Sequence, residues 1–99
     1  SAIMELRDNG VTVVGTAGET QKSIYDIDQA KAFAWVLGAE GEGLRQLTRR
    51  RCDELAAIPM VGSVESLNVS VASGICLFES LRQRIAAGIV TPGKAEDRL

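Results

Sequence analysis

The sequence predicts an α/β domain built on a mostly parallel β-sheet with flanking helices. Three short segments have the β-branched or apolar composition of strands, and segments of helical composition lie before, between and after them. Strands that alternate with helices are joined by crossover connections, which make neighbouring strands parallel. The 99 residues suffice for one small domain or for part of a larger one.

The first part of the chain predicts a helix and two strands. Helix-forming residues fill 2–9, and a glycine follows at the expected helix end. The β-branched segment 11–14 predicts the first strand, which the glycines of 15–18 are expected to end. Residues 19–31 are polar and predict a loop or a short strand, whereas the continuous apolar run 33–37 predicts a strand covered on both faces.

The second part predicts a helix over 44–54, a strand over 55–58 and a long helix over 67–85. The long helix has apolar residues at steps of three and four, which indicates one buried face. That face comprises Leu67, Val71, Ile75, Phe78, Leu81 and Ile85. We expect 1–88 to form the folded domain and 89–99 to be a loose C-terminal tail.

Composition excludes several classes of protein. Eleven basic against thirteen acidic residues give a net charge of −2, which argues against a strongly basic nucleic-acid-binding shell. No apolar run approaches the length of a membrane span, and no basic segment precedes one as in a signal peptide. We therefore expect a cytoplasmic protein, with neither a membrane nor DNA as a partner.

Histidine is absent, which removes the usual zinc ligand and the usual general base. We accordingly predict no metal site. The two cysteines, Cys52 and Cys76, are 24 residues apart in a chain with no CxxC motif, so we expect reduced thiols. Any catalysis must therefore use other groups of this chain, or groups outside it.

Ligands of parallel sheets bind beyond the carboxyl ends of the strands, which here points to the loops at 15–19, 38–43 and 60–68. The middle loop is rich in glycine but carries Glu40 and Glu42. Two carboxylates would repel a phosphate by roughly 4 kcal/mol each at 4 Å. The loop therefore favours a neutral or cationic ligand over a nucleotide phosphate, although a simple connection with solvated glutamates fits equally well.

Polar side chains crowd the start of the long helix. They are Ser63, Ser66, Asn68, Ser70 and Ser73. A helix cap needs only one such residue, so the surplus suits a ligand with several hydroxyl groups. The alternative is that these residues are caps and solvated serines.

Three further features admit a structural and a functional interpretation. The run Arg49–Arg51 is either a solvated helix end or a surface that contacts RNA phosphates. Trp35 is interpreted as a core residue rather than a platform for base stacking. Glu79 and Arg82 are spaced to pair on the surface of the long helix, with little effect on stability.

Two segments resemble a known family. Residues Val36–Leu44 (VLGAEGEGL) and Ile58–Glu79 (IPMVGSVESLNVSVASGICLFE) resemble the second and third signature motifs of the SpoU (TrmH-type) family. These are RNA ribose 2′-O-methyltransferases of the SPOUT superfamily. With VVGTAGE at 13–19, the resemblance extends over roughly 1–85 and narrows to members that methylate a guanosine of 23S ribosomal RNA.

The resemblance implies S-adenosylmethionine as cofactor, ribosomal RNA as partner, a homodimer, and a C-terminal trefoil knot. The family positions that line the cofactor correspond to Gly38, Ile58, Met60 and Leu67. Those that organise the reaction centre correspond to Glu40, Ser66, Asn68 and Ser70.

The chain departs from the family pattern in one respect. The family's first motif, which supplies an asparagine and an arginine, has no match in 1–99, and neither has an N-terminal RNA-binding domain. The resemblance therefore implies the C-terminal part of a catalytic domain, incomplete for catalysis on its own. An alternative is a catalytically silent module of the same fold that dimerises and binds RNA. A nucleotide-phosphate binder is a third, less favoured reading.

Overall fold

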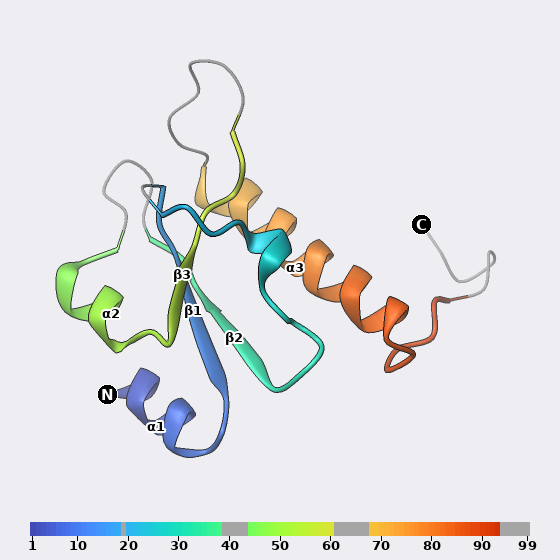
Figure 1. Cartoon of the computed structure of the whole chain (residues 1–99), viewed down its shortest axis with the longest axis horizontal. Helices are drawn as coiled ribbons and strands as arrows, with labels where there is room; N and C mark the ends of the chain where they lie inside the picture. The colour runs from blue at the N-terminus through green and yellow to red at the C-terminus, as the bar shows by residue number, and fades with distance from the viewer. Residues whose placement is uncertain (19, 39–43, 61–67, 94–99) are drawn as a thin grey trace.

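Helices and strands alternate along the chain, as the computed structural model shows for residues 1–18, 20–38, 44–60 and 68–93 (Figure 1). The elements are α1 (Ala2–Asp8), β1 (Thr12–Thr16), the 3-10 helix η1 (Ile24–Asp26), β2 (Phe33–Val36), α2 (Gln46–Arg51), β3 (Glu54–Ala56) and α3 (Val69–Ala86).

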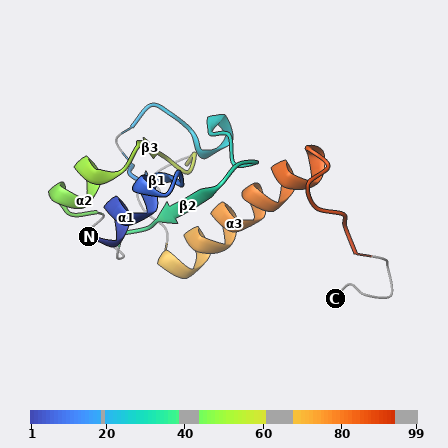
Figure 2. The ribbon, with the colours of Figure 1, turned by 90° about the horizontal axis from the view of Figure 1, so that it is seen from below.

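The three strands form one parallel sheet in the order β2-β1-β3, which confirms the predicted α/β class. In the register of the sheet, Val14 of β1 lies beside Trp35 of β2 and Glu54 of β3. Figures 1 and 2 show α1 and α2 on one side of the sheet and α3 with η1 on the other. None of the helices in the described ranges is long and apolar enough to cross a membrane.

The core lies against the central strand β1, where Val13 and Val14 are fully buried. Val14 belongs to a cluster with Ile24, Ala56 and Cys76, which joins η1 and α3 to the sheet. Because side chains alternate between the faces of a strand, Val13 and Gly15 face the opposite side, toward α1 and α2.

Gly15 lies inside β1, which ends one residue later at Thr16, so the strand ends within the predicted segment 15–18 but not at its first glycine. A Cβ atom at Gly15 would lie 2.6 Å from Leu44 Cδ1, 3.0 Å from Cys52 Sγ and 3.1 Å from Leu55 Cδ2. Glycine in a strand often marks such a close approach. The missing side chain therefore lets the segments on either side of α2 pack directly on the sheet.

Gly15→Ala is expected to lower the free energy of unfolding by about 1–3 kcal/mol, because the added methyl group overpacks this contact. Gly18→Ala is the matched control, since a Cβ there meets no atom of the described residues within 4 Å. Urea denaturation of both variants measures the difference. Equal stability of the two variants would contradict the close approach at Gly15.

The element bounds differ from the predicted ones around α2. The helix is shorter than the predicted 44–54, because Cys52 has an extended ψ of 147° and ends it. Asp53 then anchors the chain: its Oδ2 accepts a hydrogen bond from Val13 N at 2.7 Å, and its Oδ1 lies 2.9 Å from Arg7 Nε. β3 consequently begins at Glu54, one residue before the predicted start of the strand.

β2 is an edge strand of this sheet, and all four of its residues are half-buried. The prediction that the run 33–37 is covered on both faces is therefore wrong for this chain. The composition of a segment indicates that its side chains are apolar. How much of the strand other elements cover depends on its position in the sheet.

The long helix α3 presents a different face to the core than the one predicted. The buried residues of α3 are Ala72, Cys76 and Glu79. Within the predicted apolar face, Val71 is 52% exposed and Phe78 is 74% exposed. The prediction is wrong for Val71, Phe78 and Leu81, whereas Ile75 packs against the core as predicted. The small residues Ala72 and Cys76 allow the helix to pack closely on the sheet.

A buried polar network fixes the C-terminal half of α3 against the segment that precedes β2. The side chain of Gln29 is fully buried, its Nε2 donates to Ile24 O at 2.8 Å, and its Oε1 accepts from the Ser80 hydroxyl. Gln83 Oε1 accepts from Gln29 N at 2.7 Å. Buried polar groups with all partners in place specify one packing arrangement.

Glu79 adds a buried charge to this face of the helix. Its carboxylate receives two hydrogen bonds from Arg82, at 2.7 and 2.8 Å, and one from Gln83 at 2.8 Å. The Arg82 hydrogen bonds lower the pKa of Glu79, against the opposing effect of burial. The expected pair is confirmed, but Glu79 is buried rather than on the surface.

Candidate functional site

The two segments that resemble the family motifs, 36–44 and 58–79, begin at the carboxyl edge of the sheet. β2 and β3 run parallel to β1 on its two sides, so the chain leaves both strands at the same edge. Gly38 follows β2 by two residues, and Ile58 follows β3 by two residues. Strands spaced about 4.8 Å apart place these two exits about 10 Å from each other, across the end of β1.

Unpaired backbone groups stand at both exits. Within the described residues, the backbone groups of Gly38 and Met60 form no hydrogen bond with the rest of the chain. Backbone N–H and C=O groups require partners, so such groups are suited to recognition of a polar ligand. Ile58 lies beside them and packs on the hydrophobic core, which provides an apolar wall.

The N-terminus of α3 contributes the third part of this edge. Figure 1 shows the first turn of α3 at the end of the molecule where the strands finish. Asn68 is the N-cap, and its Oδ1 accepts a hydrogen bond from Ser70 N at 2.8 Å. The expectation that a polar residue of this cluster caps the helix is therefore confirmed for Asn68.

The predicted site residues divide into two groups. The structure places Gly38, Ile58 and Met60 at the strand exits, and Asn68 and Ser70 at the start of α3. It describes no direct contact between the exits and α3 among these five. Three further predicted residues, Glu40, Ser66 and Leu67, lie outside the described residues, as do the whole segments 39–43 and 61–67.

Neither cysteine has the properties of a nucleophile. Burial raises the pKa of Cys76 to about 11, and burial together with the charge of Asp53 raises the pKa of Cys52, although Arg7 opposes the shift. A raised thiol pKa leaves little thiolate at neutral pH. Both thiols are free, as expected. No group of three potential metal ligands occurs among the described residues.

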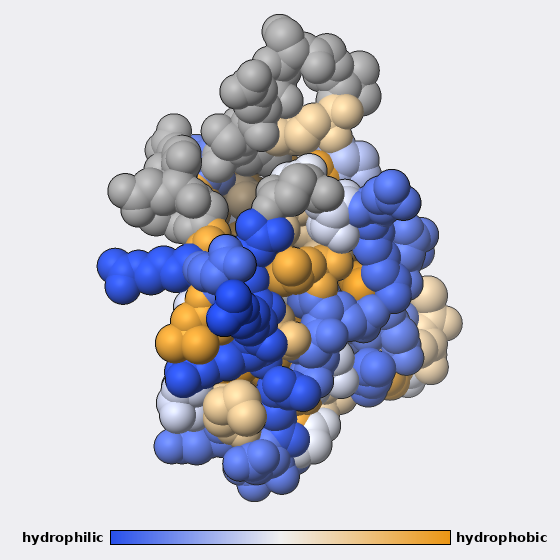
Figure 3. All heavy atoms as spheres, turned by 60° about the vertical axis from the view of Figure 1, so that its left-hand side comes forward, coloured by the Kyte–Doolittle hydropathy of each residue, from blue (hydrophilic) through white to orange (hydrophobic). Residues whose placement is uncertain are grey.

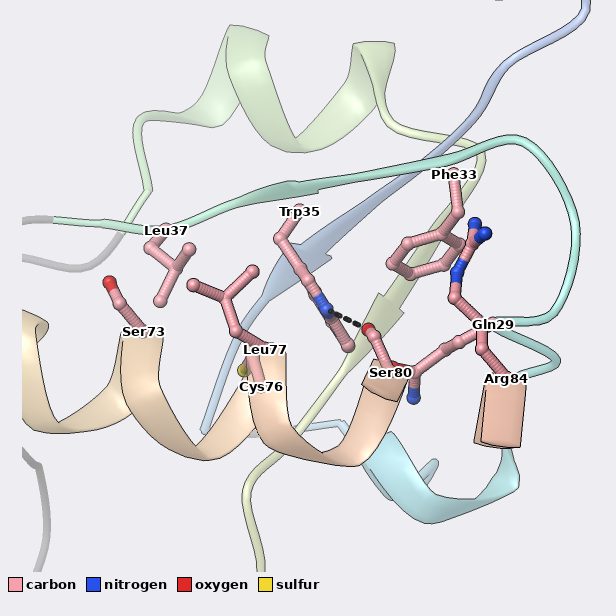
Figure 4. Close-up of a pocket in the computed structure, with 9 residues that line it drawn as sticks. All are labelled: Gln29, Phe33, Trp35, Leu37, Ser73, Cys76, Leu77, Ser80 and Arg84. Carbon is pink, nitrogen blue, oxygen red and sulfur yellow. Dashed lines mark hydrogen bonds between the residues drawn. The ribbon is translucent and has the colours of Figure 1, made fainter. Parts of the chain in front are cut away.

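A separate cavity of about 360 Å³ lies between β2 and α3 (Figure 4). Trp35 closes part of it and donates its indole N–H to Ser80 Oγ at 3.1 Å, so the tryptophan packs between the sheet and the helix. Phe33 supports Trp35 in an edge-to-face contact, with ring centroids 4.9 Å apart. The structure thus agrees better with the prediction that Trp35 is a core residue than with the alternative of a base-stacking platform.

Sequence reasoning missed Gln29, which lies in a segment predicted as loop, and Arg45, which stands immediately before α2 at the carboxyl edge. No periodicity could reveal Gln29. Arg45 carries a weak signal, because arginine is an unusual residue at a helix N-cap.

A parallel sheet between two helical layers, with polar groups and free backbone groups at its carboxyl edge, places the chain in the class of α/β folds whose ligand sites lie at that edge. The chain belongs to the SpoU rRNA Methylase family, whose sequence model matches residues 1–78.

Named relatives agree with this family. The chain is 58% identical over 80 residues to the 23S rRNA (guanosine-2′-O-)-methyltransferase RlmB of Bordetella pertussis, an alignment that covers 81% of this chain and 33% of the relative. It is also 58% identical over 79 residues to RlmB of Escherichia coli K12, covering 80% of this chain and 32% of that one. The chain therefore spans about a third of the length of these relatives.

Solved structures share the fold. The TrmH/SpoU tRNA modifying enzyme of A. aeolicus has a TM-score of 0.82 and 34% identity, over 89% of this chain and 45% of that one. The SpoU methyltransferase AviRb of Streptomyces viridochromogenes, in complex with the cofactor AdoMet, has a TM-score of 0.75 and 34% identity, over 84% of this chain and 34% of that one.

Proposed function

We propose that the protein containing this chain transfers a methyl group from S-adenosylmethionine to the ribose 2′-hydroxyl of a guanosine in 23S ribosomal RNA. The observation that carries the proposal is the 58% identity to proteins named for this reaction, over a stretch that contains the strand exits and the N-terminus of α3. The proposal places this activity in the cytoplasm, where ribosomal RNA is found.

The described residues offer the kinds of polar and apolar groups that the cofactor requires. Free backbone groups of Gly38 and Met60 suit the donors and acceptors of an adenine ring, and Ile58 suits its apolar face. Leu67 is the fourth proposed cofactor residue. When bound, S-adenosylmethionine supplies an electrophilic methyl group on a positively charged sulfur.

The chain's own residues have two tasks in this reaction. They must hold the ribose oxygen in line with the methyl group, and they must help the 2′-hydroxyl to lose its proton as the new bond to carbon forms. We assign the orientation of this centre to Glu40, Ser66, Asn68 and Ser70. The position of Asn68 at the N-cap supports its part in this assignment, because a capped helix end fixes the backbone from which the side chain extends.

The proposal includes the organisation of the domain. Residues 1–88 form the C-terminal part of the methyltransferase domain, and 89–99 form its tail. The C-terminal trefoil knot belongs to the same proposal, and the segments 39–43 and 61–67 lie outside the described residues.

The proposed assembly is a homodimer in which α3 meets its counterpart. Its outward side carries a stripe at alternating steps of three and four, which comprises Val71, Gly74, Phe78, Leu81 and Ile85. This spacing suits the packing of one helix on another, and a symmetric pair would cover the same stripe in both copies.

The function test is calorimetric titration of the complete protein that contains this chain with S-adenosylmethionine and with its demethylated product. We expect saturable heat and a higher Tm, since ligand at 100 times Kd adds about 2.7 kcal/mol of stability. ATP serves as the control ligand and is expected to give neither effect. Absence of heat and thermal shift with millimolar S-adenosylmethionine would overturn the proposal. RNA binding without cofactor binding would instead support the silent module.

A further inference from the structure

We propose that the arginine-rich segment of α2, with Arg45 and Arg50 as its exposed members, contacts the phosphate groups of the RNA substrate. The inference rests on the proposed function, because that proposal supplies RNA as the partner. It adds a second surface to the site at the carboxyl edge, one that holds the RNA backbone and takes no part in methyl transfer.

The first argument is local charge. Residues 44–52 contain four arginines and no acidic residue, although the whole chain carries a net charge of −2. Arg45 and Arg50 are exposed, and neither forms an ion pair with any residue in the described ranges. Two other basic side chains are paired: Arg7 binds Asp53 and Lys22 binds Glu54.

The second argument is that helix stability does not explain Arg45. Arg49–Arg51 stand in the last turn of α2, where positive charge interacts favourably with the helix dipole. Arg45 stands at the opposite end, as an N-cap whose side chain makes no capping hydrogen bond. Serine, threonine, asparagine or aspartate would stabilise this position, and a cation there is unfavourable.

The third argument is location. Leu44, the neighbour of Arg45, packs against Gly15, which pairs in register with Val36 near the end of β2. Arg45 therefore stands close to the strand exit that leads to Gly38. Figure 3 shows strongly hydrophilic side chains gathered on this side of the molecule, beside the atoms drawn in grey.

The segment has a suitable reach for a nucleic-acid backbone. Five residues of helix rise about 7.5 Å, so Arg45 and Arg50 can contact different phosphates of one strand. Guanidinium groups bind phosphate oxygens in a bidentate way, which fixes the position of the strand without reading its sequence.

The test measures the RNA affinity of the complete protein that contains this chain against salt concentration, with a ribosomal RNA fragment and with an RNA of unrelated sequence. For single-stranded RNA, each lost phosphate contact is expected to reduce the salt slope by about 0.7 and to weaken binding about fivefold at 0.1 M salt. Arg45→Gln and Arg50→Gln are each expected to show this loss equally on both RNAs. Arg45→Lys is expected to retain most of the slope.

Lys31→Gln is the matched control, since it removes the same charge from an exposed residue that precedes β2 at the opposite edge of the sheet. We expect its salt slope to equal that of the unmodified chain. An unchanged slope in both arginine variants, or an equal loss in Lys31→Gln, would overturn the inference. Arginine-dependent binding to vesicles of phosphatidylserine and phosphatidylcholine, with no loss on RNA, would do so as well.

Failure of this inference is distinguishable from failure of the proposed function. Cofactor titration is independent of the arginines, so normal S-adenosylmethionine binding with an unchanged salt slope overturns only the RNA surface. Loss of cofactor binding with an arginine-dependent salt slope overturns only the methyltransferase proposal.

Discussion

Asn68→Ala is expected to reduce methyl transfer by about 100-fold or more while RNA affinity changes less than twofold. Misplacement of a reacting group by about 1 Å can cost a factor of about 100 in rate, and loss of one oriented donor costs a factor of about 100–1,000. The measurement is transfer of a labelled methyl group to ribosomal RNA by the complete protein that contains this chain. A rate within threefold of the unmodified protein would remove Asn68 from the reaction centre.

The capping role of Asn68 must be separated from its proposed role in the reaction. Its Oδ1 accepts from Ser70 N, so Asn68→Ala also removes the cap, at a cost of about 0.5–2 kcal/mol in stability. Asn68→Ser is the matched control because serine caps helices equally well. We expect Asn68→Ser to unfold at nearly the original Tm yet to transfer methyl groups slowly. Full activity in Asn68→Ser would show that the residue acts through the cap alone.

The same pair of variants separates the enzyme from the silent module. A module that only binds RNA and dimerises would keep both properties in Asn68→Ala and would show no methyl transfer before the substitution either. The enzyme loses transfer and keeps binding.

The class of fold could be predicted from the sequence because each strand has a local signal. Three apolar or β-branched segments between helical ones are enough to predict a parallel sheet, and the structure has that sheet. The error at Gly15 has a physical cause. Glycine usually breaks a strand, but inside β1 it is required by the approach of Leu44 and Cys52, which are distant in sequence.

The orientation of α3 could not be predicted from its periodicity. Spacing identifies which residues share a face, but it does not say which neighbour covers that face. The more apolar stripe contains Phe78 and faces away from this sheet, while Ala72 and Cys76 pack inward with the charged Glu79. Only the hydrogen bonds that Glu79 receives from Arg82 and Gln83 make its burial acceptable, and composition does not reveal them.

The candidate site was predictable where it follows directly from strand order. Parallel strands finish at one edge, so Gly38 and Ile58 had to emerge together once β2 and β3 were both placed beside β1. The roles of Glu40, Ser66 and Leu67 come from the family resemblance alone and stay predictions. Arg45 required the structure, because its significance depends on its standing at the N-cap of α2.

Phe78→Glu is expected to convert the proposed dimer into monomers. Phe78 is 74% exposed on the outward stripe of α3. This exposed fraction is far larger than is usual for a phenylalanine in a folded protein. Truncation of an aromatic anchor at an interface typically costs about 2 kcal/mol or more, equivalent to about a 30-fold rise in Kd, and a buried carboxylate adds a desolvation cost. Sedimentation equilibrium of the variant and the unmodified protein measures this change.

Leu47→Glu is the matched control for this prediction. Leu47 is 55% exposed on α2, across the sheet from α3, so it makes the same change from apolar to acidic on a surface outside the proposed interface. We expect it to remain dimeric, which separates loss of the interface from a general effect of added charge. Because α3 also carries Asn68 at its N-cap, pairing of two copies along this helix would hold both reaction centres in place. Monomers that transfer methyl groups at the full rate would show that this support is not needed, and a monomeric unmodified protein would overturn the proposed dimer.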